Sequence, residues 1–282
     1  MSSPVAEHRR RLRALLALAA GAAIVATTAQ SAGAIGTWSS PAVVYDPTTI
    51  QSTAYSYAPD LIPGTNDRAW SCHSRSSGTI RDDIFETKLS SSGAVLSSVS
   101  VLSGSGTGWD NYHNCDPSIV AVNATIGGTG YTYAMFYTGN DADCSCHNQV
   151  GVAFSNSLDG PWTKYSSPVV AFDSSKSTSL WGEGQPSATT INAAAGTVVL
   201  TWSSGYTSNP ADTKAYFAQV SFATGAPVIS SKHQIQTTGL TDLNGAQDYL
   251  NNFDIVYSTT RDAFGLLVGY GWASRPRVTP ST

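Results

Sequence analysis

A proline-led segment recurs along the chain, each time opening a short run of apolar and β-branched residues. The three copies are APDLIP at 58–63, DPSIVAV at 116–122 and QPSATTI at 185–191. A fourth run, FDIVYST at 253–259, begins in the same way without the proline. Self-similarity at a nearly fixed period is the signature of a repeat architecture. We therefore expect the chain to build its core from several similar units.

Each repeat contains further strand-like runs after its first one. The second runs end in aromatic and small residues and cover 67–74, 131–140, 197–205 and 264–271. Third and fourth runs are predicted at 82–90 and 94–102, at 149–157 and 168–174, and at 215–223 and 227–235. Four short antiparallel strands in a unit of roughly 55 to 70 residues are typical of a β-propeller blade.

The sequence predicts an all-β fold, a β-propeller of the five-bladed type with four-stranded antiparallel blades. No stretch carries apolar residues at helical spacing for three turns, and Gly, Ser, Thr, Tyr and Trp are abundant. A β-sandwich with evenly spaced strands is the alternative, but a sandwich has no reason to restart with the same proline-led strand. Only two strands of a fourth unit precede the turn-like end at 273–282, so the propeller is expected to be incomplete at the C-terminus. The segment TWSSPAVVY at 37–45 is a candidate strand for covering the last edge.

Residues 1–34 are predicted to be a bacterial-type signal peptide and not part of the fold. HRRRLR at 8–13 is a basic n-region, an apolar h-region follows it, and AGA at 32–34 is a small-residue cleavage site. The apolar run is shorter than the about 20 residues that span a membrane. We therefore expect a secreted mature domain at 35–282 that has no membrane attachment once the signal peptide is removed.

The charge balance argues against one class of partner. The chain carries 15 Lys and Arg against 19 Asp and Glu, a net charge of −4, and several of the arginines lie in the leader. Nucleic-acid binding depends on clustered basic residues that displace counterions from phosphates, and no such cluster follows the leader. We expect no nucleic-acid partner and a monomeric protein.

Every repeat start holds an acidic residue: Asp60, Asp116, Glu183 and Asp254. In a propeller the first strand of each blade lines the central channel, so acids that are far apart in sequence meet in one pocket. Hydrolysis of a glycosidic bond uses one carboxylate as base or nucleophile and one protonated carboxyl as acid, and crowding raises the pKa of at least one of them. A structural interpretation stands beside this one, because Asp before Pro is a common turn residue that bonds its own downstream backbone.

The second repeat carries the most specific resemblance to a known family. DPSIV at 116–120, YTYAMFYTG at 131–139 and VGVAFSNSLDGPWTKY at 150–165 resemble the five-bladed propellers of glycoside hydrolase family 43, the arabinosidases and xylosidases, and their fructan-cleaving relatives. The similarity spans roughly residues 55–270.

That family places an Asp base, an Asp that tunes the pKa of its neighbours and a Glu acid on three successive blades. The resemblance therefore implies these roles for Asp60, Asp116 and Glu183, with inversion at the anomeric carbon. The chain departs from the family pattern in three blades. Blade one reads APD where the family usually shows DP, and blade two reads DP where the family usually shows AP followed by an acid. In blade three, two residues separate Glu183 from Pro186, whereas the family's acid directly precedes Gly-Pro.

Aromatic residues supply candidate sugar platforms, because flat rings suit the apolar faces of sugars. Trp109 and Trp181 precede strands that feed the predicted pocket, and we expect them to bind substrate together with Asp254 and His113. The aromatics at the ends of the second strands are expected to pack between blades instead. These are Trp70, Tyr137, Trp202 and Tyr270.

The four cysteines, Cys72, Cys115, Cys144 and Cys146, are expected to form two disulfides in an exported chain. Because Cys144 and Cys146 are only two positions apart, we expect each to pair with Cys72 or Cys115. A metal site is the alternative, since CHS, HNC and CSCH place histidines beside the same cysteines. Their spacing matches no structural zinc pattern, so no metal ligand is predicted.

These features predict a secreted glycoside hydrolase that acts on plant-type polysaccharides or oligosaccharides containing arabinose or xylose. Acid/base chemistry by carboxylates requires no cofactor. An ion bound in the channel is an open alternative without support in the sequence. The rival function is a non-catalytic carbohydrate-binding propeller, which keeps the fold and the aromatic pocket without the reaction.

Overall fold

The computed structural model describes most residues between 55 and 268. The described residues are 55–62, 67–74, 81–209, 212–241, 245, 246, 250 and 252–268. The predicted signal peptide, the candidate closing strand at 37–45, Tyr270 and the end at 273–282 lie outside them. Within the described part of the chain, no helix has the length and apolar character needed to cross a membrane.

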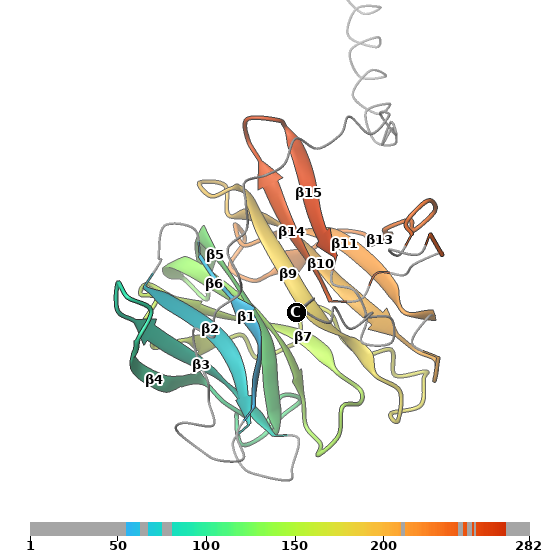
Figure 1. The fold of residues 1–282 in the computed structure, drawn as a ribbon, viewed down its shortest axis with the longest axis horizontal. Helices are drawn as coiled ribbons and strands as arrows, with labels where there is room; N and C mark the ends of the chain where they lie inside the picture. Colours follow the sequence, from blue (N-terminus) through green and yellow to red (C-terminus); the bar gives the residue numbers. More distant parts are fainter. Residues whose placement is uncertain are drawn as a thin grey trace, which may run out of the picture. The chain divides into compact units, whose positions relative to one another are not determined.

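The first sheet has four antiparallel strands in sequence order (Figure 1). Its strands are β1 (Ser56–Asp60), β2 (Arg68–Ser74), β3 (Asp82–Leu89) and β4 (Val95–Leu102). All four were predicted within a few residues, because each is a short run of alternating side chains bounded by turn residues.

The second sheet also has four antiparallel strands in sequence order. Its strands are β5 (His113–Ile126), β6 (Thr129–Asn140), β7 (Gln149–Ser155) and β8 (Thr163–Lys164). The predicted fourth strand at 168–174 is wrong. The turn after β7 returns the chain at once, so that Thr163 and Lys164 pair with Phe154 and Ala153, and Val170 makes only a single bridge to β7.

The third sheet repeats this arrangement, and a fourth begins. The strands of the third are β9 (Gly182–Asn192), β10 (Thr197–Gly205), β11 (Lys214–Ser221), β12 (Val228–Ile229) and β13 (His233–Gln234). The single strand predicted at 227–235 is thus two short ones, and both pair with β11. The fourth sheet consists of β14 (Phe253–Ser258) and β15 (Ala263–Val268). The prediction of an all-β fold with four-stranded antiparallel sheets is confirmed.

Two apolar clusters pack neighbouring sheets together. One joins the second and third sheets through side chains such as Phe136, Phe154 and Trp202. The other joins the first and second sheets through Trp70 and Tyr137. The three described aromatics at the second-strand ends are fully buried, as expected for packing between blades.

The first strands of consecutive sheets lie side by side, so that β1 contacts β5, β5 contacts β9, and β9 contacts β14 (Figure 1). A polar side chain on each strand accepts a hydrogen bond from a backbone N–H of the next. The three bonds run from Ile119 N to Asp60 Oδ2 (2.8 Å), from Ala188 N to Ser118 Oγ (3.0 Å) and from Ile255 N to Ser187 Oγ (3.0 Å). These three bonds join the first strands of the four sheets in sequence order.

Each first strand is irregular at its proline-led motif. Pairing with the second strand shifts register at this motif in β1, β5 and β9, which is the mark of a β-bulge. The residue before each proline has a positive φ, a conformation that non-glycine residues rarely adopt. These residues are Ala58 (49°), Asp116 (49°) and Gln185 (53°), and Asn252 (50°) holds the same place before Phe253. Proline suits the next position because it has no N–H to pair.

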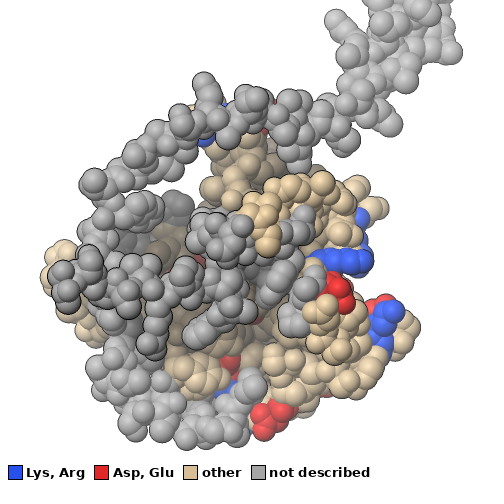
Figure 2. Space-filling model, turned by 45° about the vertical axis from the view of Figure 1, so that its right-hand side comes forward, with Lys and Arg blue, Asp and Glu red and all other residues tan. Residues whose placement is uncertain are grey.

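Charged side chains are sparse on the surface as well as in the sequence. On the face drawn in Figure 2, the acidic and basic groups of the described residues lie close to one another among uncharged side chains. Each basic group of the described residues that this view shows therefore stands singly and not in a cluster.

Candidate functional site

Three consecutive residues at each of the four repeat starts line one cavity of about 470 Å³. The lining segments are 58–60, 116–118, 185–187 and 252–254. Since each segment contains one of the positive-φ residues, the bulges turn four repeat starts toward the same space. The four repeat starts therefore meet at one cavity, as the sequence predicted.

A second cavity of about 410 Å³ adjoins the first, because the four positive-φ residues line both. The other residues of the second cavity are Tyr57, His113, Thr138, Ser145, Asn148 and Trp181. We call the first space the inner cavity and the second the outer cavity.

Three carboxyl groups line the inner cavity, those of Asp60, Asp116 and Asp254. Burial, with a smaller contribution from the nearby charge of Asp254, raises the pKa of Asp60 to about 7, while backbone hydrogen bonds from Ile119 and Leu61 oppose the rise. Asp254 itself accepts hydrogen bonds from the Ser187 hydroxyl and from the Ile255 backbone.

Asp116 lies where the two cavities meet. Burial raises the pKa of its carboxyl to about 6, with hydrogen bonds from Thr138 and the Gln185 backbone opposing the rise and the charge of Asp82 adding to it. Its own backbone N–H points at the Cys72 sulfur, 2.8 Å away. Asp116 is thus a carboxyl that is held by several contacts and has a raised pKa.

Glu183 is not brought to this group. Of the residues that the structure describes, those lining the two cavities do not include it. Its carboxylate accepts a hydrogen bond from Trp202 Nε1 (2.8 Å) and lies 3.9 Å from Lys232 Nζ, and the residue is 2% exposed. It stands two positions before the bulge residue Gln185, in register with Ser204 of β10. The bulge at Gln185 and Pro186 interrupts the regular alternation of side chains along β9, and the Glu183 carboxylate lies against Trp202 of the neighbouring strand instead of at the cavity.

Of the four predicted binding residues, three line a cavity and one does not. Trp181 and His113 line the outer cavity and Asp254 the inner one. Trp109 lines neither: its ring stacks on Tyr137 with 5.9 Å between centroids. Gly151 leaves the space for this packing, since a Cβ there would lie 2.6 Å from the Trp109 ring.

Sequence reasoning missed a buried polar group beside the outer cavity. Asp82 is fully buried at the start of β3 and accepts hydrogen bonds from the hydroxyls of Tyr55 (2.6 Å) and Tyr57 (2.8 Å). Its backbone N–H donates to His113 Nδ1 (3.3 Å), and burial lowers the pKa of that imidazole. No motif marks Asp82, because its partners come from β1 and β5.

Gln185 was also missed, although it lies in a motif that the sequence singled out. The residue lines both cavities, and its buried side-chain Oε1 has no hydrogen-bond partner among the described residues. An unpaired acceptor at a cavity wall is available to a ligand that carries hydroxyl groups.

The disulfides correct the predicted pairing. Cys72 is joined to Cys115, and Cys144 is joined to Cys146. The Cα atoms of Cys144 and Cys146 are 5.2 Å apart, which lies within the range that a disulfide spans. The bend of the β6–β7 connection brings the two residues to this distance, so their closeness in sequence does not prevent the bond.

A scan against protein-family models and a search of the curated proteins both find no match. Solved structures do match. A family 117 glycoside hydrolase from the marine bacterium Zobellia galactanivorans aligns with a TM-score of 0.51 at 12% identity, over 75% of this chain and 62% of that chain. A thermostable family-43 glycoside hydrolase gives 0.40 at 16% identity, over 72% and 59%. The endo-arabinase of Bacteroides thetaiotaomicron VPI-5482 gives 0.44 at 11%, over 74% and 72%.

The match with the family 117 glycoside hydrolase confirms the predicted resemblance at the level of fold. The present chain spans 59% and 62% of the first two neighbours' lengths.

Proposed function

We propose that the protein is a secreted glycoside hydrolase that cleaves plant-type polysaccharides or oligosaccharides containing arabinose or xylose. The observation that carries the proposal is the inner cavity, where three carboxyl groups from separate sheets meet and two of them, Asp60 and Asp116, have raised pKa values. Clustered carboxyls with perturbed pKa values are typical of hydrolytic sites. The sugar class rests on the resemblance of residues 116–165 to family 43, and export rests on residues 1–34.

The surroundings of the two carboxyls favour an assignment of roles that differs from the family's. Burial raises the pKa of both, and a hydrogen bond from the Thr138 side chain favours the ionised form of Asp116. Asp60 would then give its proton to the leaving oxygen while Asp116 takes a proton from the attacking water. Asp254 supports this division because its charge helps to keep Asp60 protonated.

The outer cavity supplies the binding groups in this proposal. The Trp181 ring would carry the apolar face of a sugar, and the unpaired Oε1 of Gln185 would accept a bond from a sugar hydroxyl. Tyr57 is held in place by its bond to Asp82 and presents its ring to the same space. No cofactor is needed for this chemistry.

The test is hydrolysis of aryl arabinosides, xylosides and fructosides by the wild-type protein and two variants. We expect Asp116→Asn to lower kcat/KM by about 10²- to 10⁴-fold, the contribution of a general acid or base. Glu183→Gln is the comparison, because its carboxylate is buried against Trp202 and lines neither cavity. A loss of turnover in Glu183→Gln with full activity in Asp116→Asn would reject the inner cavity as the reaction site.

A carbohydrate-binding propeller without catalysis is the second candidate. Two observations favour it: Glu183 lines neither cavity, and Asp60 Oδ2 is already engaged by the Ile119 backbone. Calorimetric binding of arabinan or xylan oligosaccharides by the wild-type protein, with no release of aryl alcohol from any glycoside of the panel, would establish this function over hydrolysis.

A further inference from the structure

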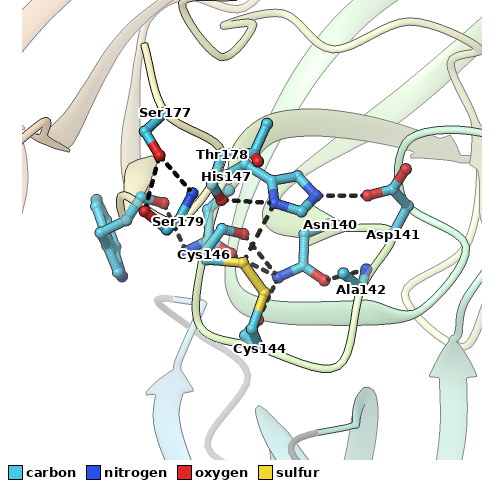
Figure 3. Close-up of a disulfide and its surroundings, with 11 residues drawn as sticks. Asn140, Asp141, Ala142, Cys144, Cys146, His147, Ser177, Thr178 and Ser179 are labelled. Atoms are coloured by element: carbon cyan, nitrogen blue, oxygen red, sulfur yellow. Dashed lines mark hydrogen bonds and ion pairs between the residues drawn. A yellow bond between two sulfur atoms is a disulfide. The ribbon is translucent and has the colours of Figure 1, made fainter.

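A cluster of metal-ligating side chains lies in the connection between β6 and β7. Cys144, Cys146 and His147 place their sulfur and nitrogen atoms within 4.8 Å of one another. His147 Nδ1 is 3.2 Å from the Cys146 sulfur (Figure 3). All three residues are half-buried, and Ser145 between the cysteines lines the outer cavity. The cluster is therefore accessible and adjoins the proposed binding region without belonging to it.

Asp141 completes the group from the other side of the imidazole. Its Oδ1 lies 2.5 Å from His147 Nε2, so the ring is held between a carboxylate and a sulfur (Figure 3). A histidine that binds a metal through one nitrogen commonly donates the other N–H to a carboxylate, which fixes the ring and makes the ligand nitrogen more basic. The carbonyl of Thr178 lies 3.1 Å from Nδ1 and accepts its proton when that nitrogen carries one.

The shape of this connection does not depend on the disulfide alone. The buried amide of Asn140 donates to the backbone carbonyls of Cys144 (2.7 Å) and Cys146 (3.2 Å) and to Asn148 Oδ1 (3.0 Å). The backbone N–H of His147 also donates to the Leu180 carbonyl (2.7 Å). The two sulfurs would therefore stay close together after the bond between them is broken.

Stability does not explain why these two cysteines are joined. A disulfide stabilises a fold mainly by closing a loop in the unfolded chain, and the effect grows with the length of that loop. The bond between Cys144 and Cys146 spans a sequence separation of 2, against 43 for Cys72 and Cys115. Because this disulfide restrains the unfolded chain so little, reversible oxidation and reduction is a better explanation for it than stabilisation of the fold.

We propose that Cys144, Cys146 and His147 form a redox-gated site for a thiophilic d¹⁰ ion, Zn²⁺ or Cu⁺. A dithiol reductant supplies two electrons and two protons, which break the S–S bond and leave two thiols, while the dithiol becomes a disulfide. Metal binding then displaces the two thiol protons and forms two metal–sulfur bonds and one bond to His147 Nδ1. Asp141 keeps the Nε2 proton and positions the ring, and oxidation to the disulfide removes the site.

The experiment uses Co²⁺ as a spectroscopic probe for the zinc site. The purified protein is treated with a dithiol, freed of reductant without air, and titrated with Co²⁺. We expect one equivalent to bind with a thiolate-to-cobalt charge-transfer band that Zn²⁺ abolishes, and no band in the oxidised protein. Asp141→Asn should weaken binding by about 10- to 100-fold, because it touches only the imidazole.

The control is the double variant Cys144→Ser/Cys146→Ser, which retains only Cys72 and Cys115 as cysteines. It should show no band under the same treatment. A band of equal strength in this variant would overturn the proposal, as would reduced wild-type protein that keeps its circular-dichroism spectrum and binds no Co²⁺. Peptide mapping of free thiols identifies which disulfide was opened in each sample.

Discussion

Asp60 has two roles, one in stabilising the fold and one in the proposed reaction. It lines the inner cavity, and it accepts the backbone bond from Ile119 that ties the first sheet to the second. The equivalent residues of the next two sheets, Ser118 and Ser187, make the same kind of bond with a hydroxyl. The substitution Asp60→Ser therefore removes the carboxyl group and keeps a hydroxyl that can accept the hydrogen bond from Ile119 N–H.

We predict that Asp60→Ser lowers turnover by about 10²- to 10⁴-fold, because the proton donor is lost. Asp60→Ala should show the same loss of turnover and be less stable than Asp60→Ser by about 1–3 kcal/mol, because the Ile119 N–H is left unpaired. Urea unfolding and initial rates on the best aryl glycoside measure the two effects separately. Full activity in Asp60→Ser would reduce Asp60 to a structural residue.

At the scale of strands, the two disulfides act on very different lengths of chain. Cys72 in β2 and Cys115 in β5 join the first two sheets directly behind Asp116, across a sequence separation of 43. Cys144 and Cys146 lie within one connection, with a separation of 2. The first bond restrains the unfolded chain far more than the second.

Replacing Cys72 and Cys115 together by serine should lower the free energy of unfolding by about 4 kcal/mol, and replacing Cys144 and Cys146 by about 1.5 kcal/mol or less. Denaturant titration of the two double variants checks this order. Equal losses would mean that the short disulfide supports the fold through contacts that chain entropy does not describe.

For the whole molecule, the Asp60 carboxyl at the inner cavity makes the free energy of unfolding depend on pH. The folded-state pKa of Asp60, about 7, lies above its unfolded value of 3.8. The folded state therefore binds more protons between these values, and this contribution to stability is present below about pH 4 and lost as the pH rises through 7. Burial lowers the pKa of His73 to about 4, which works in the opposite direction, because stability is then lost as the pH falls below 6.5.

Comparing Asp60→Asn with the wild-type protein isolates the first of these effects. The amide keeps an oxygen for the Ile119 N–H and carries no charge. We expect it to raise the free energy of unfolding by about 1–4 kcal/mol at pH 8 and to give no gain at pH 4. Urea unfolding at both pH values measures the difference, and an equal change at both would show that the Asp60 carboxyl is not a proton-binding group of the folded state.

The sequence by itself determined the repeats, most of the strands and the place where the first strands begin. The proline-led motifs could be read because a bulge tolerates a residue without a ladder N–H, and this preference is local. The strand at 168–174 was misplaced because a turn, not apolar content, decides which residues return to pair with β7. The acids were found, and Asp60, Asp116 and Asp254 line one cavity.

Only the tertiary structure showed that Glu183, unlike the other three acidic residues, does not line that cavity, and which cysteines pair. Glu183 precedes a bulge residue by two positions, and its carboxylate is bound by Trp202 of the neighbouring strand. The bend that joins Cys144 to Cys146 depends on the amide of Asn140. In both cases the outcome depends on the direction of a side chain within a packed sheet or turn, which the order of residues alone does not specify.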